Sequence, residues 1–211
     1  NTVYAFKYND FKELEKIVKN KNIGIIKMEV FRNIKPKNNF LQKVRRLADR
    51  NKIILIFDEC TSGFRETYGG LHKKFNVIPD MAIFGKTLGN GYAITAICGK
   101  KEVMDHTQDS FVSSTFWSEK VGFVAGLKCI EIMKRINSAE IILSKGHYIR
   151  KRLLQLFEKN KLKVKLSDSI SMPSFIFESD MHNYYKTLIT KLMLKKSYLA
   201  SNIIYISTSH S

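Results

Sequence analysis

The octapeptide FGKTLGNG, residues 84–91, places the primary amine of Lys86 among glycines. A lysine flanked by glycine and threonine can hold a nucleotide phosphate, whereas a lysine at the end of a strand can attack a carbonyl as a covalent catalyst. An acidic pair, Asp58 and Glu59, follows the apolar run KIILIF, and Asp58 lies 28 positions before Lys86. The sequence therefore offers two chemistries for Lys86, namely phosphate binding and covalent catalysis.

Phosphate binding requires the loop G-x-x-x-x-G-K-[ST], whose first glycine lets backbone N–H groups wrap around the phosphate. Five positions before Gly85 the chain has Asp80, and a carboxylate there would repel a phosphate. The residues between them, MAIF, are typical of a strand, and the lysine follows the acidic strand, which reverses the usual order. A phosphate-loop NTPase is therefore kept only as a remote alternative.

Covalent catalysis needs a different partner for the lysine. Functional groups gather beyond the carboxyl ends of strands in a parallel sheet, so we expect Asp58 and Lys86 to face one crevice. A lysine that forms a Schiff base and an aspartate that keeps a ring nitrogen protonated are the two groups required by pyridoxal 5′-phosphate (PLP). Spacing alone is weak evidence, because the chain has 28 lysines and most lysines lie on surfaces.

The pattern of apolar residues predicts the elements that position these groups. The first half predicts an α/β domain with a largely parallel sheet, with helices at 10–20 and 38–51 and strands at 23–30, 52–57, 81–84 and 94–98. The second half predicts a smaller α+β lobe, with helices at 117–135, 138–159 and 182–196 and strands at 161–166, 174–177 and 202–206. We expect a large-domain part at 1–137 and a small-domain part at 138–211.

The segment 55–105 carries an ordered series of motifs. They are DE-x-x-x-GFR at 58–65, a glycine pair at 69–70, V-x-PD at 77–80, GK at 85–86, a glycine cluster at 89–91 and G-[RK]-x-E-[VI]-M at 99–104. This series resembles the core signature of class III aminotransferases of fold type I, most closely the glutamate-1-semialdehyde 2,1-aminomutase-like branch. The resemblance extends more weakly over nearly the whole chain.

The resemblance implies a PLP enzyme that moves an amino group between a small-molecule amino donor and an aldehyde or ketone acceptor. An aminotransferase and a 2,1-aminomutase share these residues, so both remain open, and an amino-sugar substrate is also possible. Lys86 matches the lysine that carries PLP as a Schiff base and then shuttles a proton. Asp58 matches the partner of the pyridinium nitrogen.

Two further positions are implied as cofactor contacts. Cys60 stands where the family usually has valine or isoleucine against the ring face, although core packing alone would also explain a cysteine there. Thr115, in SSTFWS, matches a threonine that reaches the phosphate of the neighbouring subunit's PLP, which implies a homodimer. The alternative for Thr115 is a cap for the helix expected from residue 117.

Other polar residues receive lesser roles. We expect at most a supporting role for Glu29 and Glu59. No metal site is expected, because the three cysteines lack metal-binding spacing, and His72, His106 and His182 are interpreted as ordinary surface or loop residues.

Composition limits the partners and the compartment. The formal charge is +17, but 28 of the 36 basic residues are lysine and they are spread along the chain, so nucleic-acid binding is not expected. No apolar run approaches the roughly 20 residues that span a bilayer. An odd number of cysteines and no signal peptide predict a reduced, cytoplasmic protein.

One part of the family's pattern is missing. The family's phosphate-binding Gly-Ser/Thr loop and the aromatic ring that stacks on PLP come from a region before the first residue of this sequence, and the final C-terminal helix is not matched either. The chain is therefore expected to hold the lysine and aspartate half of a site. An inactive or incomplete fragment of such an enzyme is the main alternative.

Overall fold

The computed structural model describes residues 2–210, which form two compact units. One unit runs to Phe31 and resumes over Pro36–Ile136, and the other joins Arg32–Lys35 to the residues from Asn137 onward. The short insert 32–35 belongs to the second unit because Asp168 binds its backbone on both sides. The Asp168 N–H donates to the Asn33 carbonyl at 2.7 Å, and the Lys35 N–H donates to Asp168 Oδ2 at 2.8 Å.

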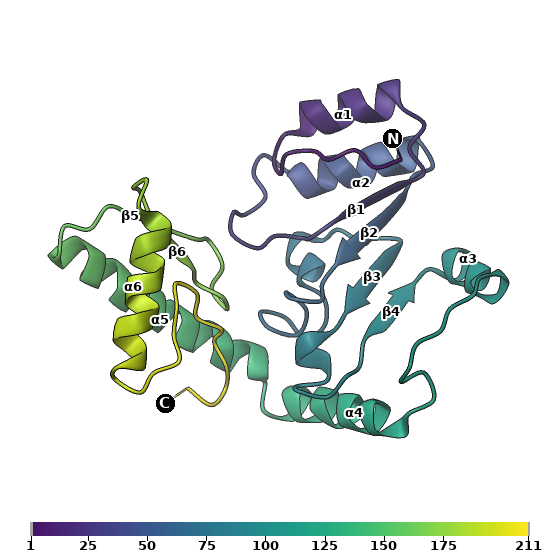
Figure 1. Cartoon of the computed structure of the whole chain (residues 1–211). Helices are drawn as coiled ribbons and strands as arrows, with labels where there is room; N and C mark the ends of the chain where they lie inside the picture. Colours follow the sequence, from purple (N-terminus) through teal and green to yellow (C-terminus); the bar gives the residue numbers. More distant parts are fainter. Residues whose placement is uncertain (1, 211) are drawn as a thin grey trace. The chain divides into compact units, whose positions relative to one another are not determined.

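A four-stranded sheet organises the first unit (Figure 1), in the order β1 (Ile25–Met28), β2 (Ile54–Asp58), β3 (Met81–Phe84) and β4 (Ala96–Gly99). The first three strands are parallel, as predicted, and β4 is antiparallel to β3. Parallel neighbours need a crossover of about a dozen residues or more. The connection over residues 85–95 contains only the short 3₁₀ helix η2 (Lys86–Leu88), so the chain turns back and β4 runs in the opposite direction.

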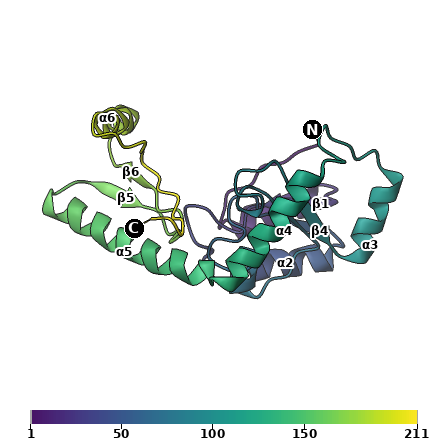
Figure 2. The ribbon, with the colours of Figure 1, turned by 90° about the horizontal axis from the view of Figure 1, so that it is seen from below.

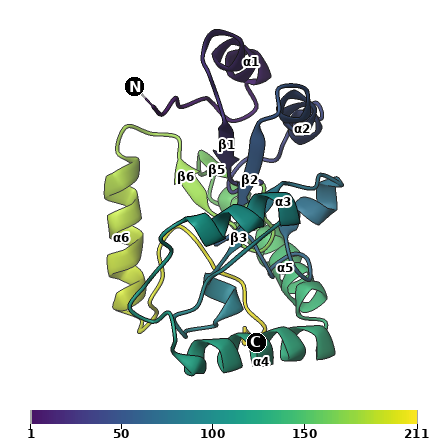
Figure 3. The same cartoon turned by 90° about the vertical axis from the view of Figure 1, so that its right-hand side faces the viewer.

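Two amphipathic helices, α1 (Phe11–Asn20) and α2 (Phe40–Arg50), lie on the same side of β1 and β2 (Figure 3). The Asp10 side chain caps α1 by accepting the Glu13 N–H at 3.0 Å. Alternate strand residues point toward these helices and form the core of the unit. This covered face consists of Ile26 and Met28 of β1 and Leu55 and Phe57 of β2, packed with Leu14, Phe40, Leu41, Val44, Leu47 and Ala48.

The intervening strand residues point to the opposite side of the sheet, which we call the open face. Its members are Ile25 and Lys27 of β1, Ile54, Ile56 and Asp58 of β2, Met81 and Ile83 of β3, and Ile97 of β4. Ile25 is 56% exposed and Ile97 is 51% exposed, although both are isoleucines within a sheet. The open face therefore has partly exposed apolar residues, whereas the apolar residues of the covered face are buried.

The remaining elements of the first unit follow the strand ends. They are η1 (Leu71–Phe75), α3 (Lys101–Met104), η3 (Asp105–Asp109) and α4 (Lys120–Arg135). Helix α4 packs closely on the connection after η2 at Gly122. A Cβ built on this glycine would lie only 3.1 Å from the Ala93 carbonyl oxygen. This close approach fixes the loop that carries Lys86 from its C-terminal side.

The second unit contains a two-stranded antiparallel sheet between two helices (Figure 2): α5 (Ser138–Lys159), β5 (Val164–Leu166), β6 (Phe175–Phe177) and α6 (His182–Leu194). Ring contacts join β6 to both helices, at 5.3 Å between the centroids of Phe157 and Phe175 and 5.1 Å between those of Phe177 and Tyr185. Within residues 2–210 no helix combines the length and the apolarity needed to cross a membrane.

The predicted last strand, at 202–206, is wrong. This segment forms a single isolated bridge, between Ser174 and Ile203, although the Ile204 and Ile206 N–H groups still donate to the Pro173 and Ser171 carbonyls. The next ladder bond toward Ile204 would need an N–H at position 173, and proline has none. The ladder therefore ends after one bridge, despite the β-branched residues at 203, 204 and 206.

Candidate active site

Asp58 is the last residue of β2 and lies on the open face. Its Oδ2 atom is 3.2 Å from Lys27 Nζ, and its Oδ1 atom accepts the Cys60 N–H at 3.2 Å. Burial acts to raise the pKa of Asp58, but the Cys60 hydrogen bond and the Lys27 ammonium outweigh it and hold the pKa below its usual value. Asp58 is therefore an ionised carboxylate at neutral pH.

Lys86 follows β3 by two residues and begins η2. Its Nζ donates to Thr61 Oγ1 at 3.0 Å, and Thr61 lies in the loop that follows β2. Within residues 2–210 Lys86 forms no ion pair, so its amine is held by a neutral hydroxyl and not by a carboxylate. Other lysines of the described residues, among them Lys27, Lys74, Lys100 and Lys128, are paired with carboxylates.

The backbone of Lys86 is strained, with φ at 45°. A left-handed conformation costs a residue with a side chain roughly 1–2 kcal/mol, and such residues persist where the surrounding structure imposes them. The surrounding contacts are the Leu88 N–H to the Gly85 carbonyl at 3.0 Å and the Asn90 N–H to the Lys86 carbonyl at 3.0 Å. The loop therefore holds the lysine in one backbone conformation.

Cys60 lies between these two groups. Its Sγ is 3.3 Å from the point where a Cβ would stand on Gly85, directly before Lys86. Burial and then the Asp58 carboxylate raise the pKa of the Cys60 thiol, while the Lys86 and Lys27 ammonium groups act in the opposite direction. The structure therefore brings together Asp58, Cys60 and Lys86, with a neutral thiol between a carboxylate and an amine.

Thr115 is not part of this group. It lies in an exposed stretch before α4, and within the described part of the chain its side chain forms no hydrogen bond. It is not the cap of the following helix either, because α4 begins at Lys120 with Glu119 at the capping position. The capping alternative is therefore wrong, and the contact with a partner's cofactor stays a prediction.

Three residues of the site were missed by sequence reasoning. Lys27 interrupts an otherwise apolar strand, and this charge was visible in the sequence, but only the strand register places it on the side of Asp58. Thr61 follows Asp58 by three residues and holds the Lys86 amine. Thr87 follows Lys86 directly, and its buried Oγ1 has no hydrogen-bond partner within residues 2–210. Nothing in the composition distinguishes either threonine from a loop residue.

Glu59 is adjacent to Asp58 but has a different environment. It is fully buried and accepts four hydrogen bonds, from Ser62 Oγ at 2.9 Å, from the Leu71 N–H at 2.6 Å, and from the N–H and Nδ1 of His72 at 3.1 and 2.6 Å. His72 lies in the connection between β2 and β3, which fits the loop alternative, but its side chain is only 13% exposed and is therefore not a surface group. These bonds close the loop between β2 and η1.

The phosphate-loop alternative finds no support. Asp80, at the position of the required first glycine, accepts the Leu55 N–H at 2.8 Å and pairs with Arg45 and Lys100 at 2.8 and 2.7 Å. Residues 81–84 are strand β3 and do not curl into a loop. Among the described residues no group of three or more histidine, cysteine or acidic side chains could hold a metal ion.

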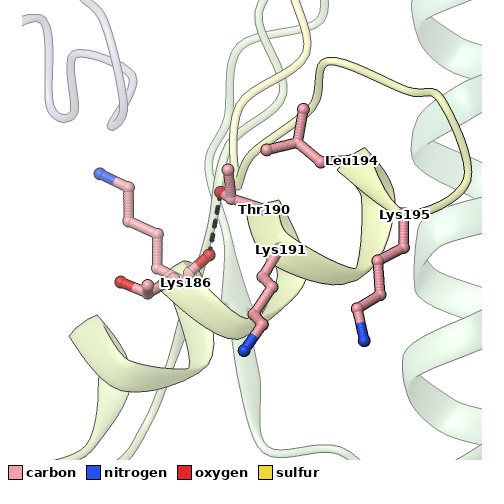
Figure 4. A pocket seen from close by; sticks show the side chains of 6 residues that line it. Lys186, Thr190, Lys191, Leu194 and Lys195 are labelled. Atoms are coloured by element: carbon pink, nitrogen blue, oxygen red, sulfur yellow. Dashed lines mark hydrogen bonds between the residues drawn. The ribbon is translucent and has the colours of Figure 1, made fainter.

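A groove of about 630 Å³ lies on α6 in the second unit (Figure 4), where the Thr190 hydroxyl donates to the Lys186 carbonyl within the helix at 3.1 Å. The groove is lined by Lys186, Thr187, Thr190, Lys191, Leu194 and Lys195. None of the residues singled out from the sequence lies in it, and its lining comes from α6 and from Lys195, the residue that follows this helix.

Comparison with known proteins identifies the class to which this fold and site belong. The sequence profile of the family described as aminotransferase class-III matches residues 33–187. The chain is 37% identical over 198 residues to 3-aminobutyryl-CoA aminotransferase of Cloacimonas acidaminovorans, which covers 90% of this chain and 48% of that protein. It is 35% identical over 166 residues to glutamate-1-semialdehyde 2,1-aminomutase of Sulfolobus acidocaldarius, covering 75% of this chain and 40% of that protein.

Solved structures show the same fold. The FumI protein of Sphingopyxis sp. MTA144, in its PLP internal aldimine form, matches with a TM-score of 0.90 at 22% identity, over 99% of this chain and 53% of that one. An omega-transaminase from Sphaerobacter thermophilus matches with a TM-score of 0.85 at 20% identity, over 97% and 52%.

The chain therefore belongs to the class III aminotransferase family. Its fold is the fold type I α/β architecture of PLP-dependent transaminases, as the sequence predicted. It spans about half the length of the relatives it matches.

Proposed function

We propose that this chain supplies the lysine and aspartate of a PLP-dependent active site that transfers an amino group between a small-molecule donor and an aldehyde or ketone acceptor. The observation that carries the proposal is that Asp58 and Lys86 lie at the carboxyl ends of the neighbouring strands β2 and β3, in a chain of the class III aminotransferase family. The Lys86 amine is bound to a neutral hydroxyl, and the Asp58 carboxylate is ionised.

The residues present suit this cofactor. The Lys86 amine, which is held by a hydroxyl, is available to an aldehyde. The Asp58 carboxylate, whose pKa is below its usual value, suits a protonated ring nitrogen. The buried Thr87 Oγ1, which lacks a hydrogen-bond partner within the described residues, offers a further polar contact next to Lys86. When bound, PLP supplies an aldehyde and an electron-withdrawing ring that stabilises negative charge at the substrate carbon.

Each residue then has a defined task. Lys86 would hold the cofactor covalently through Nζ, and its free amine would take and return a proton at that same atom. Thr61 orients Nζ through its hydroxyl, which accepts a hydrogen bond from it. Asp58 would keep the proton on the ring nitrogen, and the neutral Cys60 would pack as a small apolar group against the ring.

The finer assignments rest on the family. Aminotransferase and 2,1-aminomutase both occur among the similar proteins, and the site residues described above serve both reactions. We propose a homodimer in which Thr115 contacts the partner subunit's cofactor phosphate, which agrees with its exposed position. We also propose a cytoplasmic location, in keeping with three unpaired cysteines.

An incomplete site is the second candidate. It is favoured by the fact that the chain spans about half the length of its relatives. Such a chain would still present Lys86 to the aldehyde while lacking groups needed for turnover. Cofactor attachment and amino-group exchange therefore have to be measured separately.

The decisive test is the site of covalent attachment. The purified chain is mixed with an equimolar amount of PLP, reduced with borohydride and digested, and the labelled peptides are quantified by mass spectrometry. We expect the label to concentrate on Lys86 and to disappear in Lys86→Ala. The matched control Lys101→Ala, which removes an exposed lysine, should keep the Lys86 label.

A label spread evenly over the lysines, or one that persists in Lys86→Ala, would show that Lys86 is not the attachment residue. A Lys86 label without exchange of an amino group from any amino-acid donor would instead favour the incomplete site. The two candidates are thus separated by two readouts on one preparation.

A further inference from the structure

Lys27 is a charged residue in the middle of an otherwise apolar strand, flanked by Ile25, Ile26 and Met28. We propose that Lys27 is a positioning residue that holds the Asp58 carboxylate from the open face of the sheet and competes for it with a cationic ring nitrogen. The proposal rests on the proposed function, because it concerns the carboxylate that would hold the ring nitrogen.

Strand register explains how the two side chains meet. Lys27 is paired with Ile56 in the parallel ladder between β1 and β2, and Asp58 lies two residues further along β2. Because side chains alternate between faces, Lys27, Ile56 and Asp58 all point to the open face. The long lysine side chain extends along the sheet to reach Oδ2 of Asp58 at 3.2 Å.

Both carboxylate oxygens of Asp58 are engaged in this arrangement. Oδ1 accepts the Cys60 N–H, which is fixed by the backbone, and Oδ2 meets the Lys27 ammonium. A protonated ring nitrogen that binds at Oδ2 would share this oxygen with Lys27 or displace the Lys27 ammonium from it. Displacement is feasible because the Lys27 side chain is 56% exposed and flexible, whereas the Cys60 amide cannot move away.

Two like charges at one carboxylate oppose each other, so Lys27 disfavours the protonated form of the ring nitrogen. The pair is partly exposed, and the Asp58 side chain itself is 30% exposed, so solvent screens the effect. We expect removal of the Lys27 charge to strengthen binding of a protonated ring by roughly two- to tenfold. The other titratable groups at this place are the Cys60 thiol and, acting on that thiol, the Lys86 amine.

The first experiment needs no cofactor. The titration of the Asp58 side-chain carboxyl is followed by NMR in the wild-type chain and in Lys27→Met, with Lys27→Arg as the charge-conserving variant. We expect Asp58 to titrate at higher pH in Lys27→Met and near the wild-type pH in Lys27→Arg. The matched control Lys100→Met, which removes a partner of Asp80, should leave the Asp58 titration unchanged.

The second experiment compares two cofactors. PLP and its 1-deaza analogue, in which a ring C–H replaces the nitrogen, are titrated by absorbance into the wild-type chain and Lys27→Met. Both carry the same phosphate and aldehyde, so their affinity ratio cancels any loss of attraction toward the phosphate. We expect Lys27→Met to raise the affinity ratio of PLP to the analogue by roughly two- to tenfold.

An unchanged Asp58 titration in Lys27→Met, or an affinity ratio that stays constant or falls, would overturn the proposal. Failure of the proposed function gives a different pattern, namely no selective labelling of Lys86. If neither cofactor binds measurably, the proposed function fails. The carboxyl titration then decides by itself whether Lys27 holds Asp58.

Discussion

The two faces of the four-stranded sheet differ in both packing and chemistry. On the covered face, Leu55 and Phe57 of β2 are completely buried under α1 and α2. On the open face, the alternating residues of the same strand end in the Asp58 carboxylate, next to Lys27. One strand thus contributes its odd-numbered positions to the core and its even-numbered positions to the open face, where Asp58 belongs to the candidate site.

This difference indicates how stability and function are divided. Parallel strands are usually covered on both faces, and here the isoleucines Ile25 and Ile97 stay half exposed. The covered face stabilises the fold by excluding water, and the open face leaves charged groups accessible at the strand ends. Substitutions on the two faces should therefore separate a loss of stability from a loss of cofactor binding.

The largest expected effect is on the covered face. Phe57→Ala should lower the free energy of unfolding by about 3–5 kcal/mol, because it removes a fully buried ring and leaves a cavity. Ile97→Ala on the open face, where the side chain is 51% exposed, should change it by roughly 0.5 kcal/mol or less. Urea unfolding followed by circular dichroism measures both.

The matched pair tests the distinction between the faces directly. Similar losses from Phe57→Ala and Ile97→Ala would show that the open face is packed in solution, for instance by self-association. Repeating the measurement over a range of chain concentrations would then expose that association, because it makes the apparent stability depend on concentration.

An intermediate effect is expected at Asp80, which joins the middle of α2 to the sheet through Arg45. Burial opposes the ionised form, but the Leu55 N–H, Lys100 and Arg45 together hold the pKa of Asp80 below its usual value. Asp80→Asn should cost roughly 1–3 kcal/mol at neutral pH, since the Arg45 side chain is only 15% exposed and loses its buried partner.

The pH dependence of this loss has a definite sign. A lowered folded-state pKa stabilises the wild type above the ordinary aspartate pKa of about 3.9, and this contribution is lost as the pH falls through the lower, folded-state value. The difference in unfolding free energy between the wild type and Asp80→Asn should therefore shrink as the pH is lowered from neutral to acidic. A gap that widens in acid would contradict the assigned partners.

Much of the covered face could be predicted from sequence, because period-two and period-3.6 apolar patterns report burial directly. The strand ends at Asp58 and before Lys86 followed from the same patterns, and the glycine and acidic motifs around them carried the family resemblance. The last strand failed because a single proline, Pro173, on the partner segment removed a ladder bond. Apolar patterns do not register a missing donor on another segment.

The candidate site was predictable only in part. Asp58 and Lys86 were proposed from their positions after apolar runs and from the family resemblance, whereas Thr61 and the contact of Glu59 with His72 depend on how a loop folds back. Lys27 was visible as a charge in an apolar strand, but its partner depends on the register between β1 and β2. Register is a property of two strands, so one strand's sequence does not reveal it.

The smallest expected effect is on the open face. Asp58→Asn should cost less than about 1 kcal/mol of unfolding free energy at neutral pH, because its ion pair with Lys27 is exposed to solvent. The folded-state pKa of Asp58 is also lowered, so this small contribution should likewise vanish as the pH falls through that value.

The measurement is the same urea series, made on Asp58→Asn and Asp80→Asn in parallel. A loss at Asp58 as large as that at Asp80 would mean that the open-face carboxylate is needed to hold the fold together. A small loss at Asp58, combined with weaker PLP binding by the same variant, would instead assign this carboxylate to the cofactor and leave stability to the covered face.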